Sequence, residues 1–497
     1  MKLYFVDHNY KYAVEQMLLT LFPDERPEYP DDPPADGEDY VKLALNRAAP
    51  TAVAVCRLRR GGEIYAGYAS VAEELLKDRQ EEGRLLSQAL KLAFYRAALA
   101  SGLSRPVWGA LTGVRPAKLM EKMLRSGMGV PEAIRRFREE YDVSAERTAL
   151  TLRCAEATLK ATSALQEKDV CLYIGIPFCP TRCAYCSFVS QSVEKSMALI
   201  EPFLNALLKE ITAAAEAVKA AGLRPVSVYF GGGTPTTLSS DQLETLFAAL
   251  EAAFDLSHVR EITVEAGRPD TITLEKLEVL RRHKVSRVSV NPQTMEDAVL
   301  EAIGRRHTAQ NIRDALALVR KVGGFQVNMD LIAGLPADTV EGFRRTMDDV
   351  IKLAPENITV HTLSRKRGSS LLENEAPLPT AQDVADMLDY AQSQLTDFGF
   401  APYYLYRQKF MSGGFENVGW TKPGAENLYN ICIMEELCGI IAMGGGASTK
   451  LTASGGRIRR IFCPKYPKEY IEKIDQLCEN KQEIAAWYTE SEGGTAP

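Results

Sequence analysis

The chain of 497 residues is predicted to adopt an α/β fold built around a parallel sheet. Two observations predict this class: short β-rich runs alternate with amphipathic helical runs after Cys171, and polar or glycine-rich segments directly follow the predicted strands. A series of β-then-α units forms a parallel sheet, because right-handed crossovers cover it with helices. Such a series could form a doubly wound sheet or a barrel, and in both cases ligands gather at the carboxyl ends of the strands.

The N-terminal segment, residues 1–165, predicts an α+β accessory domain. Residues 28–38 are rich in Pro, Asp and Gly, which is typical of a loop. The segments AVAVCRL and EIYAGYASV have the character of strands, and Gly61 and Gly62 lie between them, so we expect a hairpin. The rest of this segment is helical and ends in a long helix over about residues 145–165.

Six strands are predicted in residues 166–375, which would form the core domain. They are Leu172–Ile176, Val226–Phe230, Glu261–Glu265, Arg287–Val290, Gln326–Ile332 and Asn357–Thr362. Amphipathic helices lie between them, and Ser239 stands three residues before Gln242 in a capping-box pattern at the start of one helix. Residues 376–497 are expected to form a third, C-terminal domain.

The composition is that of a soluble globular protein, with 46% hydrophobic and 25% charged residues. The formal net charge of -6 argues against a nucleic-acid footprint over the whole protein. No run approaches the roughly 18 apolar residues of a membrane span, and the N-terminus lacks the features of a signal peptide. We therefore expect a cytoplasmic protein with reduced thiols, in which the scattered cysteines are small buried groups.

Three cysteines, Cys179, Cys183 and Cys186, lie close together in the segment IPFCPTRCAYCSF. Zinc sites usually combine two pairs of ligands, and no second pair of Cys or His is evident in this sequence. Three thiolates in one loop suit an iron–sulfur cluster with four irons, since cysteinates hold such clusters. One iron would then lack a protein ligand and stay open to another molecule. A zinc loop or three buried structural thiols are the alternatives.

Glycines and polar residues follow the other predicted strands. The residues Gly231, Gly232, Gly233 and Thr234 come after the second strand. Glycines let the backbone approach a ligand closely, although a tight turn is the alternative. Glu265 lies at the end of the third strand, Gln293 follows the fourth, Arg305 comes later in the segment IGRRH, and the fifth strand carries Asp330. Each could be a cap or a surface residue, but together they could hold a ligand with an ammonium, a carboxylate and a ribose.

The spacing Cys-x3-Cys-x2-Cys, with Tyr185 before the last cysteine, resembles that of the radical S-adenosylmethionine superfamily. The segments YIGIPFC, VYFGGGTPT, ITVEAGRPD, NPQT, GRRH and DLIAGLP together resemble the oxygen-independent coproporphyrinogen III oxidase group. The likeness is greatest to its HemZ-type branch, called coproporphyrinogen dehydrogenase. It covers about residues 171–475 and extends to the N-terminal segment WGALTGVRPAKL.

The resemblance implies a partial (β/α)6 radical-SAM barrel, with an N-terminal α+β domain and a mostly helical C-terminal extension. It implies that Cys179, Cys183 and Cys186 bind a [4Fe–4S] cluster, whose fourth iron chelates S-adenosyl-L-methionine. The residues implied to hold that cofactor are Gly231, Gly232, Gly233, Thr234, Glu265, Gln293, Arg305 and Asp330. Tyr173 matches an aromatic residue that points toward the site, and together with Glu265 it is assigned to the catalytic centre.

The implied reaction is oxidative decarboxylation of two propionate side chains of coproporphyrinogen III to vinyl groups, giving protoporphyrinogen IX. This substrate carries four carboxylates, so we expect cations near the barrel mouth. The candidates are Arg268, Arg365, Lys366 and Arg367, with a solvated basic loop as the alternative. The aromatic residues Tyr403, Tyr404, Tyr406 and Trp420 could line a tetrapyrrole pocket or lie in the core. The expected partners are the tetrapyrrole and an electron donor such as flavodoxin or ferredoxin, without nucleic acid.

One position departs from the oxidases of this group. They carry a fourth cysteine two residues after the third, and this sequence has Phe188 there. The heme-chaperone branch lacks that cysteine as well and also has an aromatic residue at the position. A heme chaperone that does not decarboxylate is therefore an alternative to the oxidase. A different radical enzyme, for example one that degrades heme or modifies RNA, is the other alternative.

Overall fold

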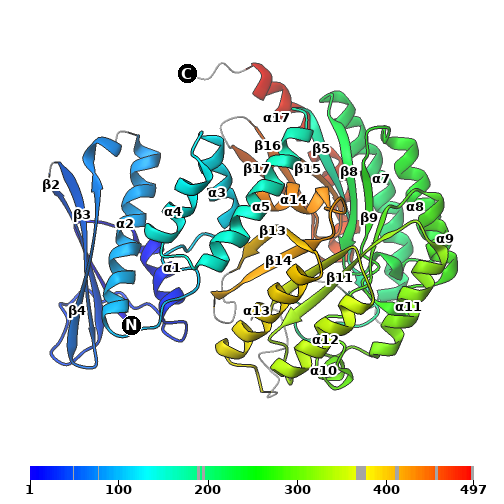
Figure 1. Ribbon diagram of the computed structural model, residues 1–497. Helices are drawn as coiled ribbons and strands as arrows, with labels where there is room; N and C mark the ends of the chain where they lie inside the picture. Colours follow the sequence, from blue (N-terminus) through cyan, green and yellow to red (C-terminus); the bar gives the residue numbers. More distant parts are fainter. Residues whose placement is uncertain are drawn as a thin grey trace. The chain divides into compact units, whose positions relative to one another are not determined.

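The computed structural model describes residues 1–48, 50–76, 78–186, 191–192, 196–364, 377–408, 414–453 and 457–493 (Figure 1). The chain forms two compact units. The first comprises Met1–Leu152 with a short segment that starts at Arg407, and the second comprises the other residues from Arg153 onward. The division into three domains, with boundaries at residues 165 and 375, stays a prediction.

The first unit contains a four-stranded sheet with the order β1-β2-β3-β4. Its strands are β1 (Lys2–Val6), β2 (Tyr40–Ala48), β3 (Thr51–Arg60) and β4 (Glu63–Ala72). β1 runs parallel to β2, and the other neighbours are antiparallel. The predicted hairpin is confirmed as β3 and β4, joined by Gly61 and Gly62, which both have the positive φ that glycine tolerates.

Helices complete the core of the first unit. The side chains of α1 (Lys11–Leu21) and α2 (Arg79–Ala100) share one hydrophobic cluster with the strands. The Asp78 side chain caps α2 by accepting from the backbone N–H of Glu81. Two more helices follow, α3 (Pro116–Arg125) and α4 (Val130–Glu139), and then α5 (Ala145–Ala164), which begins in the first unit, ends in the second and confirms the predicted long helix.

The second unit is organised by six parallel strands that pair in the order of the chain. They are β5 (Asp169–Ile176), β8 (Arg224–Gly232), β9 (Glu261–Val264), β10 (Arg287–Ser289), β11 (Gln326–Ala333) and β12 (Asn357–Thr362). All six predicted strands are confirmed, with small differences at their ends. Because the strands are parallel, their carboxyl ends lie on one edge of the sheet.

Helices connect these strands and cover one side of the sheet, as Figure 1 shows for α7, α8, α9 and α11. They are α7 (Ile200–Ala220), α8 (Ser240–Ala253), α9 (Leu274–Arg282), α10 (Asp297–Ala302), α11 (Ala309–Val322) and α12 (Val340–Lys352). The capping box predicted at Ser239 and Gln242 is confirmed at the start of α8. Short 3-10 turns lie at Glu73–Leu75, Met197–Leu199, Pro235–Thr237 and Pro269–Thr271.

The C-terminal part contributes both helices and further strands of the same sheet. Its helices are α13 (Ala381–Asp397), α14 (Leu428–Glu435), α15 (Pro467–Glu472), α16 (Ile474–Asn480) and α17 (Gln482–Gly493). Its strands are β13 (Ala401–Arg407), β14 (Glu416–Thr421), β15 (Gly439–Gly444), β16 (Ser448–Thr452) and β17 (Ile458–Phe462). The sequence did not predict these strands.

The added strands extend both edges of the parallel sheet. β14 pairs antiparallel with β12, and β15 pairs parallel with β5. The result is an 11-stranded sheet that remains open, so the partial barrel is confirmed. The side chains of Tyr403, Tyr404 and Trp420 are buried in this part of the chain, as the core interpretation expects. No helix of the described residues is both long enough and apolar enough to cross a membrane.

Candidate functional site

The three clustered cysteines lie just beyond the carboxyl end of β5. Cys179 ends the short strand β6 (Phe178–Cys179), which pairs with β7 (Gln191–Ser192), and Cys183 and Cys186 follow in a turn. All three side chains are partly exposed, whereas six of the other seven cysteines are buried. The scattered thiols thus pack as expected, while the loop keeps its sulfur atoms accessible to a ligand.

Hydrogen bonds fix the cysteine loop and place donors next to its sulfur atoms. Nη1 of Arg268 lies 3.7 Å from Sγ of Cys183 and 3.0 Å from Oγ1 of Thr181. The Thr234 hydroxyl lies 3.6 Å from Sγ of Cys179. The Arg268 guanidinium and the Thr234 hydroxyl thus lie beside two of the three sulfur atoms and fix the loop around them.

The glycine segment after β8 packs directly against the start of the cysteine loop. The backbone N–H of Gly233 donates to the carbonyl of Ile176 at 2.7 Å, and that of Thr234 donates to Phe178 at 2.7 Å. A Cβ atom at Gly233 would lie 2.4 Å from the Phe178 carbonyl oxygen, so only glycine fits there. The sequence suggested that these glycines let the backbone approach a ligand. At Gly233 the close approach is to the protein's own backbone, at Ile176 and Phe178.

Glu265 follows β9 and faces the glycine segment. Its carboxylate accepts a hydrogen bond from the Tyr229 hydroxyl at 2.5 Å, and a Cβ atom at Gly231 would lie 3.2 Å from its Oε2. Burial raises the pKa of Glu265 to about 7, and the nearby Asp330 carboxylate adds to the rise. This carboxyl group can therefore be protonated or ionised near neutral pH.

Gln293, which lies beyond the end of β10, runs beside Asp330 of β11. The backbone N–H of Gln293 donates to the carbonyl of Asp330 at 2.9 Å, and Gln293 adopts an unusual φ of 68°. The Asp330 carboxylate accepts from the side-chain amides of Asn291 and Asn328, each at 2.8 Å. These bonds hold the carboxylate in a fixed orientation, where it can accept from a further hydroxyl or ammonium.

The Arg305 side chain lies between Asn291, which holds Asp330, and Tyr185 of the cysteine loop. Its Nη1 donates to the Asn291 carbonyl at 2.6 Å, and its Nη2 donates to the Tyr185 hydroxyl at 3.0 Å. The residue is 7% exposed, and its Nε has no hydrogen-bond partner in the described part of the chain. A buried guanidinium N–H without a partner suits a ligand carboxylate, because leaving it unpaired is costly.

Three tyrosine rings stack beside Glu265. Tyr173 on β5 lies 6.3 Å from Tyr229 on β8 and 6.1 Å from Tyr429 on α14, between ring centroids. Tyr229 and Tyr429 are 4.3 Å apart. The stack forms an apolar wall next to the carboxylates. Sequence reasoning assigned Tyr173 but missed Tyr229, Tyr429 and Asn291, although Tyr229 and Asn291 lie within the motifs VYFGGGTPT and NPQT.

The structure thus brings most of the assigned residues together at one edge of the sheet, while their individual roles stay predictions. Arg268 is placed at the cysteine loop, where both sides of its guanidinium are engaged by Thr181, Cys183 and Asp270. The other assigned cations, Arg365, Lys366 and Arg367, lie outside the described residues, as does Phe188.

The site fits a [4Fe–4S] cluster and S-adenosyl-L-methionine. A single metal ion favours ligand sulfur atoms that lie close together. Among the described residues, the three loop cysteines do not bring all their sulfur atoms within 4.8 Å of one another. Their wider spread suits a cluster that distributes its ligands over several irons. The unpaired Nε of Arg305 and the carboxylates of Glu265 and Asp330 suit the carboxylate, ammonium and ribose of the cofactor.

Comparison with known proteins agrees with this geometry. The sequence profile of the Radical SAM superfamily matches residues 173–350, and members of that superfamily use a [4Fe–4S] cluster and S-adenosyl-L-methionine. The chain is 41% identical over 380 residues to the oxygen-independent coproporphyrinogen-III oxidase-like protein HemZ of Bacillus subtilis. That match covers 75% of this chain and 76% of the relative. The expected cofactors and superfamily are confirmed.

Two other comparisons give a further relative and a similar fold. The heme chaperone HemW of Lactococcus lactis is 31% identical over 288 residues, which cover 57% of this chain and 70% of the relative. The solved structure of coproporphyrinogen III oxidase (HemN) from Escherichia coli is similar in fold, with a TM-score of 0.52 and 24% identity over 65% of this chain and 73% of that one. The chain therefore belongs to the coproporphyrinogen-III oxidase-like family of radical SAM proteins.

Proposed function

We propose that this protein is an enzyme that oxidatively decarboxylates two propionate side chains of coproporphyrinogen III. Each propionate would lose one β-hydrogen atom, carbon dioxide and one electron, leaving a vinyl group, and the product would be protoporphyrinogen IX. The observation that carries the proposal is the edge of the parallel sheet, where the cysteine loop, Glu265 and Asp330 meet. The printed name of the Bacillus subtilis relative supports the substrate class.

The chain's own residues divide the work of holding the cofactors. Cys179, Cys183 and Cys186 would hold the cluster, and Arg305 and Asp330 would orient the carboxylate and the ribose of S-adenosyl-L-methionine. When bound, the two groups supply the one-electron chemistry that removes an unactivated hydrogen atom. The tyrosine wall of Tyr173, Tyr229 and Tyr429 would keep water from the reacting atoms. An electron donor such as flavodoxin or ferredoxin would reduce the cluster.

A heme chaperone is the second candidate, and the similarity to HemW favours it. Such a protein would bind heme and pass it on without forming vinyl groups. The two candidates share the cluster and the cofactor, so cluster content alone does not separate them. The product of the tetrapyrrole reaction does.

The test is an anaerobic assay of the cluster-loaded full chain with S-adenosyl-L-methionine, a reductant, coproporphyrinogen III and an electron acceptor. We expect 5′-deoxyadenosine, carbon dioxide and protoporphyrinogen IX. Cleavage of the cofactor without a vinyl product, together with stoichiometric heme binding, would reject the oxidase in favour of the chaperone. Cys183→Ala should lose cluster iron and all cofactor cleavage, whereas the matched variant Cys463→Ala, at a buried thiol outside the loop, should keep both.

A further inference from the structure

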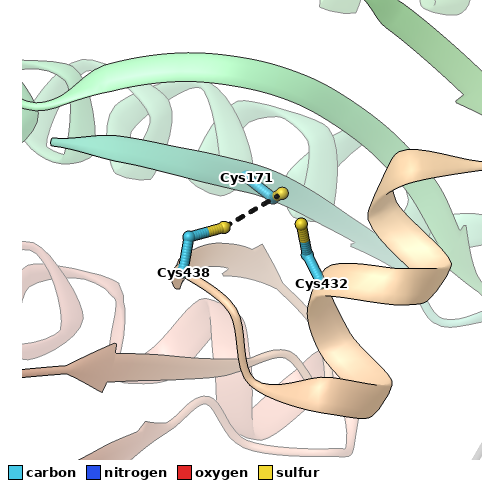
Figure 2. A group of neighbouring side chains, drawn as sticks. All are labelled: Cys171, Cys432 and Cys438. Atoms are coloured by element: carbon cyan, nitrogen blue, oxygen red, sulfur yellow. Dashed lines mark hydrogen bonds between the residues drawn. The ribbon is translucent and has the colours of Figure 1, made fainter. Parts of the chain in front are cut away.

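Three other cysteines converge in the interior of the second unit. Cys171 lies on β5, Cys432 on α14, and Cys438 immediately before β15 (Figure 2). The sulfur atoms of Cys171 and Cys438 are 3.7 Å apart, and all three sulfur atoms lie within 4.8 Å of one another. Figure 2 shows the three side chains pointing toward a common centre from three separate elements.

The surroundings of this trio are apolar. Cys171 and Cys432 are fully buried, Cys438 is 6% exposed, and the side chains packed around them include Val226 and Ile440. An apolar shell of this kind limits the access of water to a metal ion held between the sulfur atoms.

The spacing of the trio suits a single metal ion. A metal–sulfur bond of about 2.3 Å separates two sulfur ligands of a three-coordinate, trigonal ion by roughly 4.0 Å, and the 3.7 Å between Cys171 and Cys438 is slightly shorter. A four-iron cluster distributes its thiolates over separate irons and needs a wider arrangement. A disulfide between Cys171 and Cys438 would leave Cys432 without a partner, although all three thiols face the same point.

The number of ligands indicates which ion the trio would take. A structural zinc site closes its shell with four protein ligands. Among the described residues, no fourth Cys, His, Asp or Glu brings a ligand atom within 4.8 Å of all three sulfur atoms. Soft thiolate donors favour Cu(I), which accepts three sulfur ligands. We propose that Cys171, Cys432 and Cys438 form a three-sulfur site for one thiophilic ion of the Cu(I) class.

The site would tie together elements that frame the cofactor pocket. Cys171 is two residues before Tyr173 on β5, and Cys432 is three residues after Tyr429 on α14, so both ligands neighbour the stacked tyrosines. An ion that binds only the folded chain adds its binding free energy to the stability of that state. Loading the trio should therefore raise the thermal stability of the second unit.

The test uses the full chain with its iron–sulfur cluster in place, kept free of oxygen. Cu(I) is supplied as its bicinchoninate complex, and copper and iron per chain are measured after desalting. We expect one copper per chain with iron unchanged, a copper-edge X-ray absorption spectrum of three sulfur ligands, and a higher unfolding temperature. Cys432→Ser should weaken copper retention by more than the roughly 10- to 100-fold that loss of an outer partner costs.

Matched variants and a second metal make the outcome decisive. Cys154→Ala, at another fully buried thiol of the same unit, should bind copper like the unchanged chain. Cys438→Ser serves as the second ligand variant if Cys432→Ser does not fold. Copper uptake that is equal in the ligand variants, or matched by iron loss, would overturn the proposal. So would tighter retention of zinc than of Cu(I), or a Cys171–Cys438 disulfide in protein alkylated at harvest.

Discussion

The guanidinium of Arg268 lies between Cys183 of the cysteine loop and the carboxylate of Asp270. On one side its Nη1 donates to Cys183 Sγ across 3.7 Å and to Thr181 across 3.0 Å. On the other side it forms a two-point ion pair with Asp270, at 3.1 and 3.2 Å. The residue is 3% exposed, so this cation is fixed beside Cys183, which we propose as a cluster ligand. With the proposed cluster bound at Cys183, Arg268 would be in position to tune it as well as to anchor the loop.

Replacing Arg268 by Met should make the cluster harder to reduce and easier to lose. Hydrogen bonds and positive charge near a cluster sulfur favour the reduced state, so the reduction potential should become more negative. Potentials followed by electron paramagnetic resonance, with iron per chain, measure both effects. The control is Arg282→Met, an exposed arginine that pairs with Glu244. An unchanged potential with a raised KM for the tetrapyrrole would instead support the predicted substrate-binding role of Arg268.

Glu265→Gln should remove a pH dependence of stability. The pKa of Glu265 is about 7 in the folded chain against an ordinary value of 4.5, mainly because the group is buried. Below the unfolded pKa this group contributes its full stabilisation, which is lost as pH rises through 7 and amounts to about 3 kcal/mol.

Urea unfolding of the cluster-free chain at pH 5 and pH 8 checks this prediction for Glu265. The unchanged chain should lose stability between the two values through this group, and Glu265→Gln should flatten that part of the profile. The exposed Glu301→Gln is the matched control and should keep the slope. An identical slope in Glu265→Gln would show that the buried carboxyl does not hold its proton at neutral pH.

Gly233→Ala should disturb the cysteine loop through sterics alone. The added Cβ would lie 2.4 Å from the carbonyl oxygen of Phe178 and 2.9 Å from that of Ile176, so the loop must move. Overpacking of this kind costs about 1–3 kcal/mol, and iron per chain should fall with it. Gly83→Ala, where nothing lies within 4 Å of the new atom, should leave iron loading unchanged. Full loading of Gly233→Ala would contradict this account of the loop.

The strands of the core could be predicted from the sequence because each is a short apolar run bounded by turn residues. The predicted strand Asn357–Thr362 has the same bounds in the structure, and Gln326–Ile332 is longer by one residue. Strands buried on both faces lack alternating polar positions and remain visible as continuous apolar segments. The polar residues that follow the third and fourth strands, Glu265 and Gln293, were then expected on one side with Asp330 of the fifth strand, and Gln293 does pair with Asp330.

Other features depend on contacts between distant parts of the chain and leave no local signal. Cys171 and Cys438 are separated by 267 positions, and only the pairing of β15 with β5 brings them together. Arg268 reads as a free cation in the sequence, yet folding places it against Cys183. The strands from β13 to β17 were missed because they are short and mixed with helices, so their place in the sheet is set by tertiary packing.

The buried ion pair between Glu210 and Lys481 should stabilise the second unit strongly when intact. Their charged atoms are 2.7 Å apart, both residues are almost fully buried, and Glu210 also accepts from the N–H of Gly444 at 2.7 Å. Lys481→Met leaves the carboxylate unpaired and should lower the free energy of unfolding by about 3–5 kcal/mol. Adding Glu210→Gln to that variant should restore part of the loss, because the uncompensated charge is then gone.

Urea unfolding followed by fluorescence measures these changes in the free energy of unfolding. The control is Lys468→Met, at an exposed lysine of the same unit. Equal stability of Lys481→Met and the unchanged chain would mean that the pair contributes nothing to the fold.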